Sequence, residues 1–284
     1  MAGGERWYLK RRESLPFVQR HPDLDPVVAK VLYARKIDTP DKIEAFLHGD
    51  SQPVDPFRMA DMDRAVARLR QALRDGEQIV VYGDFDADGV CATTLLVCAL
   101  KALGGRVTPH IPDRFSEGYG LNIEALDRLR QQGAGLIVTV DCGIRSPNEV
   151  AHAQAHGLEV IVTDHHSVPE ELPPALAVID PKRLDCPYAF KGLAGVGVAH
   201  RLVDALCRDL RSAGRPDLDL DQFLDLVALG TVSDIVPLTG ENRILVQRGL
   251  KRMKASPRVG LGELLKIAGV DGQKVDSQAI AFRL

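Results

Sequence analysis

Three aspartates at every second position form the part of this sequence best suited to metal chemistry. Asp84, Asp86 and Asp88 lie in GDFDADG, directly after a short apolar run at residues 79–81. In an extended chain, alternation places their carboxylates on one side of the backbone. Carboxylates this close raise one another's pKa unless a cation neutralises them, so a divalent metal site is expected. The alternative is an acidic turn before a helix, because Asp and Gly favour turns and Asp favours helix starts.

The spacing excludes an EF-hand calcium loop. In such a loop a glycine occupies the sixth position and a glutamate completes the coordination at the twelfth. Counted from Asp84, the sixth residue is Gly89, but the twelfth is Leu95. A calcium-binding loop of this kind therefore does not explain the aspartates.

Polar side chains also follow three later apolar runs, at residues 107–111, 136–140 and 159–163. They are Asp113, Arg114 and Glu117 after the first run, Asp141 after the second, and Asp164, His165 and His166 after the third. The carboxyl ends of parallel strands form the ligand-binding edge of an open α/β sheet, so acids and paired histidines there favour a metal site. Asp234 stands in a largely apolar stretch, which is costly for a carboxylate unless it is paired or coordinating, and it is the expected last ligand.

The order of the elements predicts an α/β fold with a doubly wound, mainly parallel sheet flanked by helices. Apolar runs alternate with helical patterns from residue 78 onwards, and the runs are continuously apolar, as in strands buried on both faces. We expect three parts: a helical N-terminal segment at residues 1–76, the α/β domain at 77–240, and a helical segment at 241–284.

Local patterns also predict where individual helices begin. A stripe of apolar residues over 61–74 predicts a helix within the N-terminal segment. The helix after the aspartates is expected over residues 90–103. Ser146 and Glu149, in SPNE, have the spacing of a capping box at the start of another helix.

Composition and charge set limits on partners. The net charge of −3 and the isoelectric point near 6.2 show no basic surplus, so a nucleic acid has to be held by a local patch or by metal ions. Five cysteines form no CxxC pair, which favours reduced thiols and argues against a zinc site built from them. No run approaches the roughly 18 apolar residues of a membrane span, so a cytoplasmic protein without membrane partners is expected.

Four motifs, GDFDADG, VTVDCG, VTDHH and GTVSDIVPL, resemble in this order the motifs of the DHH phosphoesterase superfamily. Within it, IPDRFSEGYGLN, GLAGVGVAHRL and SDIVPLTGENR are similar to the RecJ subgroup, the 5′ to 3′ exonucleases specific for single-stranded DNA in bacterial repair and recombination. The likeness runs from about residue 20 to the last residue. It implies a metal-dependent phosphodiester hydrolase that acts on single-stranded DNA, with a single-strand-binding protein and a helicase among its partners.

The resemblance also implies two manganese or magnesium ions. Asp86 binds one ion, Asp88 binds the other, and Asp141 bridges both. His165 and Asp234 complete the ligands of the second ion. Mixed carboxylate and imidazole ligands suit manganese better than calcium, which agrees with this assignment. Two such ions lower the pKa of an attacking water and neutralise charge on the phosphate.

The same resemblance gives roles to three neighbouring residues. His166 faces the scissile phosphate or the leaving oxygen, and with Asp141 and His165 it makes up the expected catalytic group. Asp84 is a further metal ligand or supports one. Asp164 orients a histidine by hydrogen bonding.

Three residues are candidates for substrate contact. Arg114 is the expected phosphate clamp, since a guanidinium matches a phosphate with two hydrogen bonds; an ion pair with Asp113 or Glu117 is the alternative. Tyr119 is expected either to stack on a base or to pack in the core. His200 is expected either to reach a phosphate or to lie on the surface of its helix.

Two features depart from the family pattern. Many members have a histidine four residues before the first aspartate of DAD, where this chain has Tyr82, so the first ion has one ligand fewer unless Asp84 replaces it. The chain also stops at AIAFRL, where RecJ-like sequences continue into an arginine-rich motif and a DHHA1-type domain. Residues 241–284 are therefore expected to lead towards that domain, and the chain to carry the metal ligands without the full substrate grip.

Two other functions remain to be separated from the exonuclease. A short-oligonucleotide or cyclic dinucleotide phosphodiesterase, or a pyrophosphatase, would use the same metal ligands, so only the dependence on substrate length discriminates. A non-catalytic DHH-like replication subunit would typically lack metal ligands, whereas this chain has the whole set.

Overall fold

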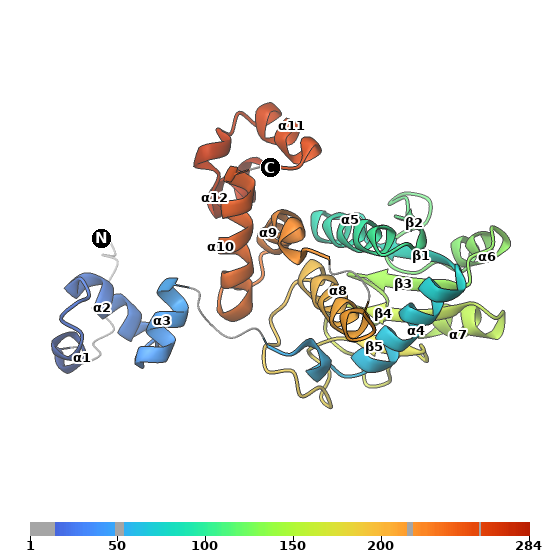
Figure 1. The fold of residues 1–284 in the computed structure, drawn as a ribbon, viewed down its shortest axis with the longest axis horizontal. Coiled ribbons are helices and arrows are strands. Elements are labelled where there is room, and N and C mark those ends of the chain that lie inside the picture. Colours follow the sequence, from blue (N-terminus) through green and yellow to red (C-terminus); the bar gives the residue numbers. More distant parts are fainter. Residues whose placement is uncertain (1–14, 49–53, 215–217, 256) are drawn as a thin grey trace, which may run out of the picture. The chain divides into compact units, whose positions relative to one another are not determined.

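The computed structural model describes residues 15–48, 54–214, 218–255 and 257–284 (Figure 1). The chain divides into two compact units, Met1–Ser51 and Gln52–Leu284. The helices described in the first unit are α1 (Leu15–Arg20), α2 (Pro26–Ala34) and α3 (Pro40–His48). They enclose a small apolar cluster that includes Phe17 and Leu32, both almost fully buried.

The second unit contains a five-stranded sheet in the order β2-β1-β3-β4-β5. The strands are β1 (Gln78–Gly83), β2 (Arg106–His110), β3 (Leu136–Val140), β4 (Glu159–Thr163) and β5 (Ala177–Ile179). Every neighbouring pair is parallel, which confirms the doubly wound parallel sheet expected from the sequence. The strand order reverses between β1 and β3, and in such sheets a crevice opens at the carboxyl ends of the two strands where it reverses.

Helices connect and follow the strands of this unit. They are α4 (Met62–Asp75), α5 (Ala87–Ala102), α6 (Ile123–Gln131), α7 (Pro147–Ala155), α8 (Gly195–Ser212), α9 (Leu224–Ser233), α10 (Gly240–Ala255), α11 (Val259–Ile267) and α12 (Ser277–Arg283), with short 3-10 helices η1 (Pro56–Arg58), η2 (Leu220–Phe223) and η3 (Gly272–Lys274). Within the described ranges, none of the helices combines the length and apolar character needed to cross a membrane.

The helices cover both faces of the sheet (Figure 1). Alternate residues of β1 point to opposite faces. Ile79 and Val81 join the apolar cluster formed with α4, α5 and α8, whereas Val80 and Tyr82 join the cluster formed with α6 and α7. The sheet is therefore sealed by apolar packing on both sides, which leaves the ends of its strands as the place for polar chemistry.

The structure corrects two boundary predictions. Helix α4, expected in the N-terminal segment, packs into the main core through Leu69 and its neighbours, so the unit that carries the sheet begins before residue 77. The capping box is also wrong, because the side chain of Ser146 makes no capping hydrogen bond to the described backbone of α7. With φ −115° and ψ 53°, Ser146 lacks the extended backbone of a typical cap.

Helices α9 and α10 pack closely, and with α11 and α12 they enclose a further apolar cluster. Gly249 of α10 permits this approach, since a Cβ added there would lie 2.1 Å from the carbonyl oxygen of Leu224 in α9. Asp234 is the C-cap residue of α9. The packing of α9 thus determines where this carboxylate lies.

Candidate metal centre

The aspartates after β1 do not share one extended segment. Asp86 is the N-cap residue of α5, and its carboxylate accepts a hydrogen bond of 2.9 Å from the backbone N–H of Gly89. The helix begins at Ala87, three residues earlier than predicted, so Asp88 lies in its first turn. The expectation that alternation places all three carboxylates on one side of an extended chain is therefore wrong.

Instead, potential ligand atoms form adjoining groups around the carboxyl ends of β1, β3 and β4. Two groups are Asp84, Asp86 and Asp141, and Asp88, His165 and Asp234, and in each group one donor atom per residue lies within 4.8 Å of the others. A further group of the same kind, Asp141, His165 and His166, lies between them. The structure thus brings together all six residues predicted to bind metal.

Asp141 and His165 connect the two groups. The Nε2 atom of His165 lies 3.0 Å from Oδ1 of Asp141 and 3.7 Å from Oδ2 of Asp234. Asp141 follows β3 directly and has a φ of 62°, a left-handed conformation that Asp and Asn tolerate better than most residues. The turn places its carboxylate beside ligands from both groups.

Several buried polar atoms in these groups have no hydrogen-bond partner among the described residues. They are Oδ1 of Asp141, both ring nitrogens of His165 and Oδ2 of Asp234. Buried polar atoms in folded proteins are nearly always paired. A divalent cation would satisfy the oxygens and an imidazole nitrogen together, so the donor set fits a metal centre.

The start of α8 fixes Asp88 within this arrangement. Its carboxylate accepts hydrogen bonds from the backbone N–H groups of Gly195, at 2.6 Å, and Val196, at 2.9 Å. Gly195 has to be small, because an added Cβ would lie 2.6 Å from Oδ1 of Asp141. The GVGV segment therefore supports two acidic residues at once, a role that the sequence alone did not reveal.

Burial of the carboxylates has a strong electrostatic effect. Burial, reinforced by the charge of Asp86, raises the pKa of Asp141 to about 9. Burial and the charge of Asp141 raise the pKa of Asp88 well above its ordinary value. The negative charge of these carboxylates is thus poorly compensated when no cation is bound.

We expect the metal-free protein to lose stability as the pH rises from about 4 to about 9. Folded Asp141 keeps its proton up to a pKa of about 9, whereas the unfolded chain releases it near 3.8. His166 acts in the same direction: its folded pKa of about 9 exceeds the ordinary 6.5, so its contribution is complete below 6.5 and is lost towards 9. Urea unfolding at about pH 5 and about pH 8, with EDTA or with Mn²⁺, measures the effect. Greater stability of the EDTA-treated protein at the higher pH would contradict it.

Asp164 organises the two histidines after β4. It is buried, and its Oδ1 accepts hydrogen bonds from the backbone N–H of His165 and from Nδ1 of His166, both at 2.7 Å, while Oδ2 accepts one from Ile144 N at 3.0 Å. The hydrogen bond to Asp164 raises the pKa of His166 to about 9. Burial opposes ionisation of Asp164, but the hydrogen bond and charge of His166 together with the backbone N–H groups of Ile144 and His165 outweigh it, and the pKa of this carboxyl falls below its usual value.

A cavity of about 580 Å³ lies beside the metal-ligand groups. Its lining includes Asp84, Asp86, Tyr119, Arg145, Asp164 and His166. Tyr119 is half-exposed and meets the ring of His166 edge-on, with a centroid distance of 6.2 Å. The cavity wall therefore combines metal-ligating groups, an aromatic ring and a cation.

Arg114 stacks on an aromatic ring near the cavity. Its guanidinium carbon lies 4.2 Å from the centroid of the Phe85 ring. The alternative partners are engaged elsewhere: Asp113 accepts a hydrogen bond from Phe115 N, and Glu117 pairs with Arg128. Stacking leaves the N–H groups of Arg114 directed to solvent or to a ligand.

His200 lies in the interior, contrary to both expectations. Its side chain is only 5% exposed, and burial lowers its pKa to about 3. The groups that act on it are Arg201, Arg248, Asp221 and the backbone of Leu220. A neutral imidazole enclosed in the α8 packing cannot reach a phosphate in the cavity, so the predicted substrate contact has no structural support and the surface position is wrong.

The structure also adds residues that the sequence reasoning missed. Arg145, Ser146, Glu149 and Ser167 line the cavity. Arg145 could have been found from the sequence, because it lies in the loop after an apolar run, as Arg114 does. Tyr82, at the family's histidine position, donates a hydrogen bond of 3.1 Å to the carbonyl oxygen of Gly120 and thereby supports the cavity wall.

Comparison with known proteins agrees with this architecture. The family model described as the DHH family, N-terminal domain, matches residues 78–231. The chain belongs to the DHH family. The match begins with β1 and ends within α9, so it spans all five strands of the sheet.

Curated relatives of this DHH chain are similar along its whole length. The single-stranded-DNA-specific exonuclease RecJ of Bacillus subtilis (strain 168) is 40% identical over 287 residues, covering 100% of this chain and 35% of the relative. The corresponding protein of Escherichia coli (strain K12) is 41% identical over 285 residues, covering 97% of this chain and 49% of the relative. The chain thus spans between a third and a half of the length of these relatives.

Solved structures agree with the same DHH fold. A crystal structure of exonuclease RecJ bound to manganese matches with a TM-score of 0.71 and 40% identity, covering 81% of this chain and 57% of that one. RecJ from Thermus thermophilus in complex with Mn²⁺ matches with a TM-score of 0.77 and 34% identity, covering 95% of this chain and 37% of that one.

Proposed function

We propose that this chain carries the catalytic metal centre of a 5′ to 3′ exonuclease that acts on single-stranded DNA. The observation that carries the proposal is the position of Asp141 between two groups of ligand atoms, several of which are buried and make no hydrogen bond with the described residues. Two divalent ions held in this way are a common arrangement for phosphodiester hydrolysis. The similarity to RecJ proteins supports the choice of single-stranded DNA as substrate.

The two groups assign the ions to named residues. Asp84, Asp86 and Asp141 would hold one ion, so that Asp84 takes the place left by the absent histidine. Asp88, Asp141, His165 and Asp234 would hold the other. Carboxylate-rich sites with imidazole suit Mn²⁺ or Mg²⁺, the ions bound by the RecJ structures. When bound, the ions would neutralise charge on the phosphate and lower the pKa of an attacking water.

His166 is suited to act on the substrate directly. Its Nδ1 is occupied by Asp164, and this hydrogen bond raises the pKa of the ring and favours its protonated form. The ring also lines the cavity, so its Nε2–H is the group available to a phosphate oxygen or to the leaving oxygen. Asp164 has the role of a positioning residue, because it fixes the orientation and the charge of this ring.

The decisive assay compares three substrates with Mn²⁺ present: a 5′-labelled single strand, the same strand as a duplex, and a three-nucleotide oligomer. Release of mononucleotides from the 5′ end of the long single strand is the expected result. Cleavage of only the trinucleotide would favour the second candidate, a small-substrate phosphodiesterase, which the same metal ligands would also serve. Equal degradation of the duplex would overturn the strand specificity.

Replacement of Arg114 by alanine is expected to raise the KM for single-stranded DNA about tenfold, with little change in kcat, because a charged hydrogen bond to phosphate is lost. Mn²⁺ affinity should stay unchanged, since Arg114 belongs to neither ligand group. Arg130→Ala, which removes an exposed arginine of α6, is the matched control. Unchanged kinetics for Arg114→Ala would assign its stacking on Phe85 a purely structural role.

Partner proteins follow from the proposed reaction. A single-strand-binding protein and a helicase would supply the single strand that the exonuclease degrades. Copurification of either protein with the full-length exonuclease, at low and high salt, tests this part of the proposal.

A further inference from the structure

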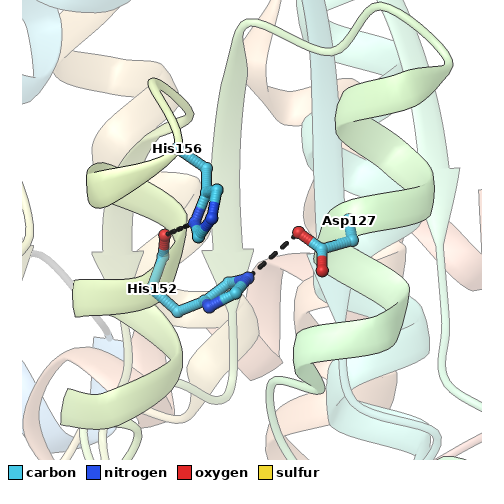
Figure 2. A group of neighbouring side chains, drawn as sticks. All are labelled: Asp127, His152 and His156. Atoms are coloured by element: carbon cyan, nitrogen blue, oxygen red, sulfur yellow. Dashed lines mark hydrogen bonds and ion pairs between the residues drawn. The ribbon is translucent and has the colours of Figure 1, made fainter.

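A second cluster of metal-ligand side chains lies on helices α6 and α7, which pack side by side on one face of the sheet (Figure 2). Asp127 of α6, His152 of α7 and His156, the C-cap residue of α7, each offer one donor atom within 4.8 Å of the others. Figure 2 shows the ring of His152 pointing from α7 towards the carboxylate of Asp127 on α6, with the ring of His156 close by. None of these residues belongs to the ligand groups at the carboxyl ends of the strands.

The spacing of the two histidines favours chelation. Residues four apart lie on the same face of a helix, so a metal ion can bind both rings at once. The ring centroids of His152 and His156 are 4.2 Å apart and their planes are tilted by 37°. Asp127 adds a carboxylate from the neighbouring helix, which makes a set of two imidazoles and one carboxylate, typical of protein sites with open coordination positions.

His156 is held in a tautomer suited to metal binding. Its Nδ1 lies 2.7 Å from the carbonyl oxygen of His152. A carbonyl only accepts, so Nδ1 carries the hydrogen and the neutral ring leaves the lone pair of Nε2 free. A backbone carbonyl that fixes the ring through its other nitrogen is the usual support of a metal-ligating histidine.

The contact between His152 and Asp127 has the separation of two ligands on one ion. The Nε2 atom of His152 lies 3.0 Å from Oδ1 of Asp127. Donors that bind a metal ion at about 2.1 Å in neighbouring coordination positions are themselves about 3 Å apart. A metal ion can therefore replace the shared proton with only small movements of the two side chains.

The cluster is separate from the cavity. Ser146 and Glu149, at the start of α7, line the cavity, whereas His156 follows the last residue of this helix. Nine helical residues span roughly 14 Å. Since α7 runs back from the carboxyl end of β3 to the amino end of β4, its C-terminus lies towards the opposite edge of the sheet.

We propose that Asp127, His152 and His156 bind one divalent transition-metal ion of the class that prefers imidazole ligands, such as Zn²⁺. This ion differs in class from the Mn²⁺ or Mg²⁺ proposed for the cavity, because imidazoles outnumber carboxylates here. It joins α6 to α7, and these helices follow the two segments that carry Tyr119 and Arg145. The ion would thereby fix α6 and α7 relative to one another and so stabilise the segments that line the cavity.

Zinc titration calorimetry tests the proposal on the whole chain, with excess Mg²⁺ in the buffer. The key variant is His156→Gln, which leaves the pair of His152 and Asp127 intact. We expect it to bind one Zn²⁺ fewer per chain than the unaltered protein, because sites outside the cluster contribute equally to both. Zn²⁺ should also raise the unfolding temperature of the unaltered protein by more than that of the variant.

Two further variants complete the experiment. His21→Gln removes a partly exposed histidine of the first unit and should bind as many Zn²⁺ ions as the unaltered protein. His156→Cys supplies a thiolate, a strong zinc ligand, and should restore the lost ion. Equal Zn²⁺ stoichiometry and affinity in the unaltered protein and His156→Gln would overturn the proposal. An equal loss in His21→Gln would overturn it as well, since binding would then be unspecific.

Discussion

Asp141→Asn is expected to lower Mn²⁺-dependent turnover by about 10³-fold or more while the fold is retained. Asp141 connects both ligand groups, and an amide is a much weaker ligand than a carboxylate for either ion. Loss of several kcal/mol of charge stabilisation corresponds to at least this factor in rate. Asparagine is the appropriate replacement because it tolerates the left-handed backbone at this position, with φ 62°.

The same variant separates loss of metal from loss of structure. Without metal, Asp141→Asn should unfold at the same temperature as the unaltered protein or higher at about pH 8, because it no longer holds a buried carboxyl with a pKa of about 9. Mn²⁺ should stabilise it less than the unaltered protein. Asp180→Asn is the matched control, as Asp180 is a buried carboxylate directly after β5 and outside the ligand groups. Turnover close to that of the unaltered protein would remove Asp141 from the centre.

Asp164→Asn is expected to lower the free energy of unfolding by about 3 kcal/mol, because an amide nitrogen would face buried N–H donors. The carboxylate accepts hydrogen bonds from His165 N, His166 Nδ1 and Ile144 N, and an asparagine cannot accept all of them. The pKa of His166, about 9 in the native protein, should fall towards 6.5 in the variant. Urea unfolding and NMR titration of the His166 ring, both without metal, measure the two effects.

Asp113→Asn supplies the control for this second prediction. Asp113 also accepts hydrogen bonds from backbone N–H groups, of Phe115 and Ser116, but in an exposed loop. Its replacement should lower the free energy of unfolding much less than Asp164→Asn does, because water can satisfy the exposed N–H groups. A His166 titration midpoint that does not move in Asp164→Asn would show that Asp164 does not set the charge of the ring.

The sequence pointed to side chains that the structure brings together, because two regularities of parallel sheets apply to them. The apolar runs define buried parallel strands, and the carboxyl ends of such strands meet at one edge. Asp141 and His165 could therefore be assigned to the same site although they follow different strands. The further assignment of Asp234 depended on its apolar neighbours in the sequence, whereas the structure leaves Ile235 exposed and positions Asp234 as the C-cap of α9.

The features that the sequence did not predict depend on tertiary packing, or on competition between a capping hydrogen bond and an extended backbone at the same residue. Helix α5 starts early because Asp86 caps it, and alternation alone cannot distinguish a capping aspartate from one in an extended chain. His200 looked accessible because histidines usually are, and only the packing of α8 encloses it. The support of Asp88 by Gly195 joins segments that are far apart in the chain, so no local pattern contains it.

The six candidate ligands follow β1, β3 and β4, begin α5 and end α9, so the centre is scattered over more than half of the chain. During synthesis on the ribosome, Asp84, Asp86 and Asp141 emerge well before Asp234. The first group can thus form with the sheet, whereas the second has to wait until α9 docks. Metal loading would consequently be ordered in time. The second ion would bind only after α9 has docked, and it would then stabilise contacts between segments that are far apart in the chain.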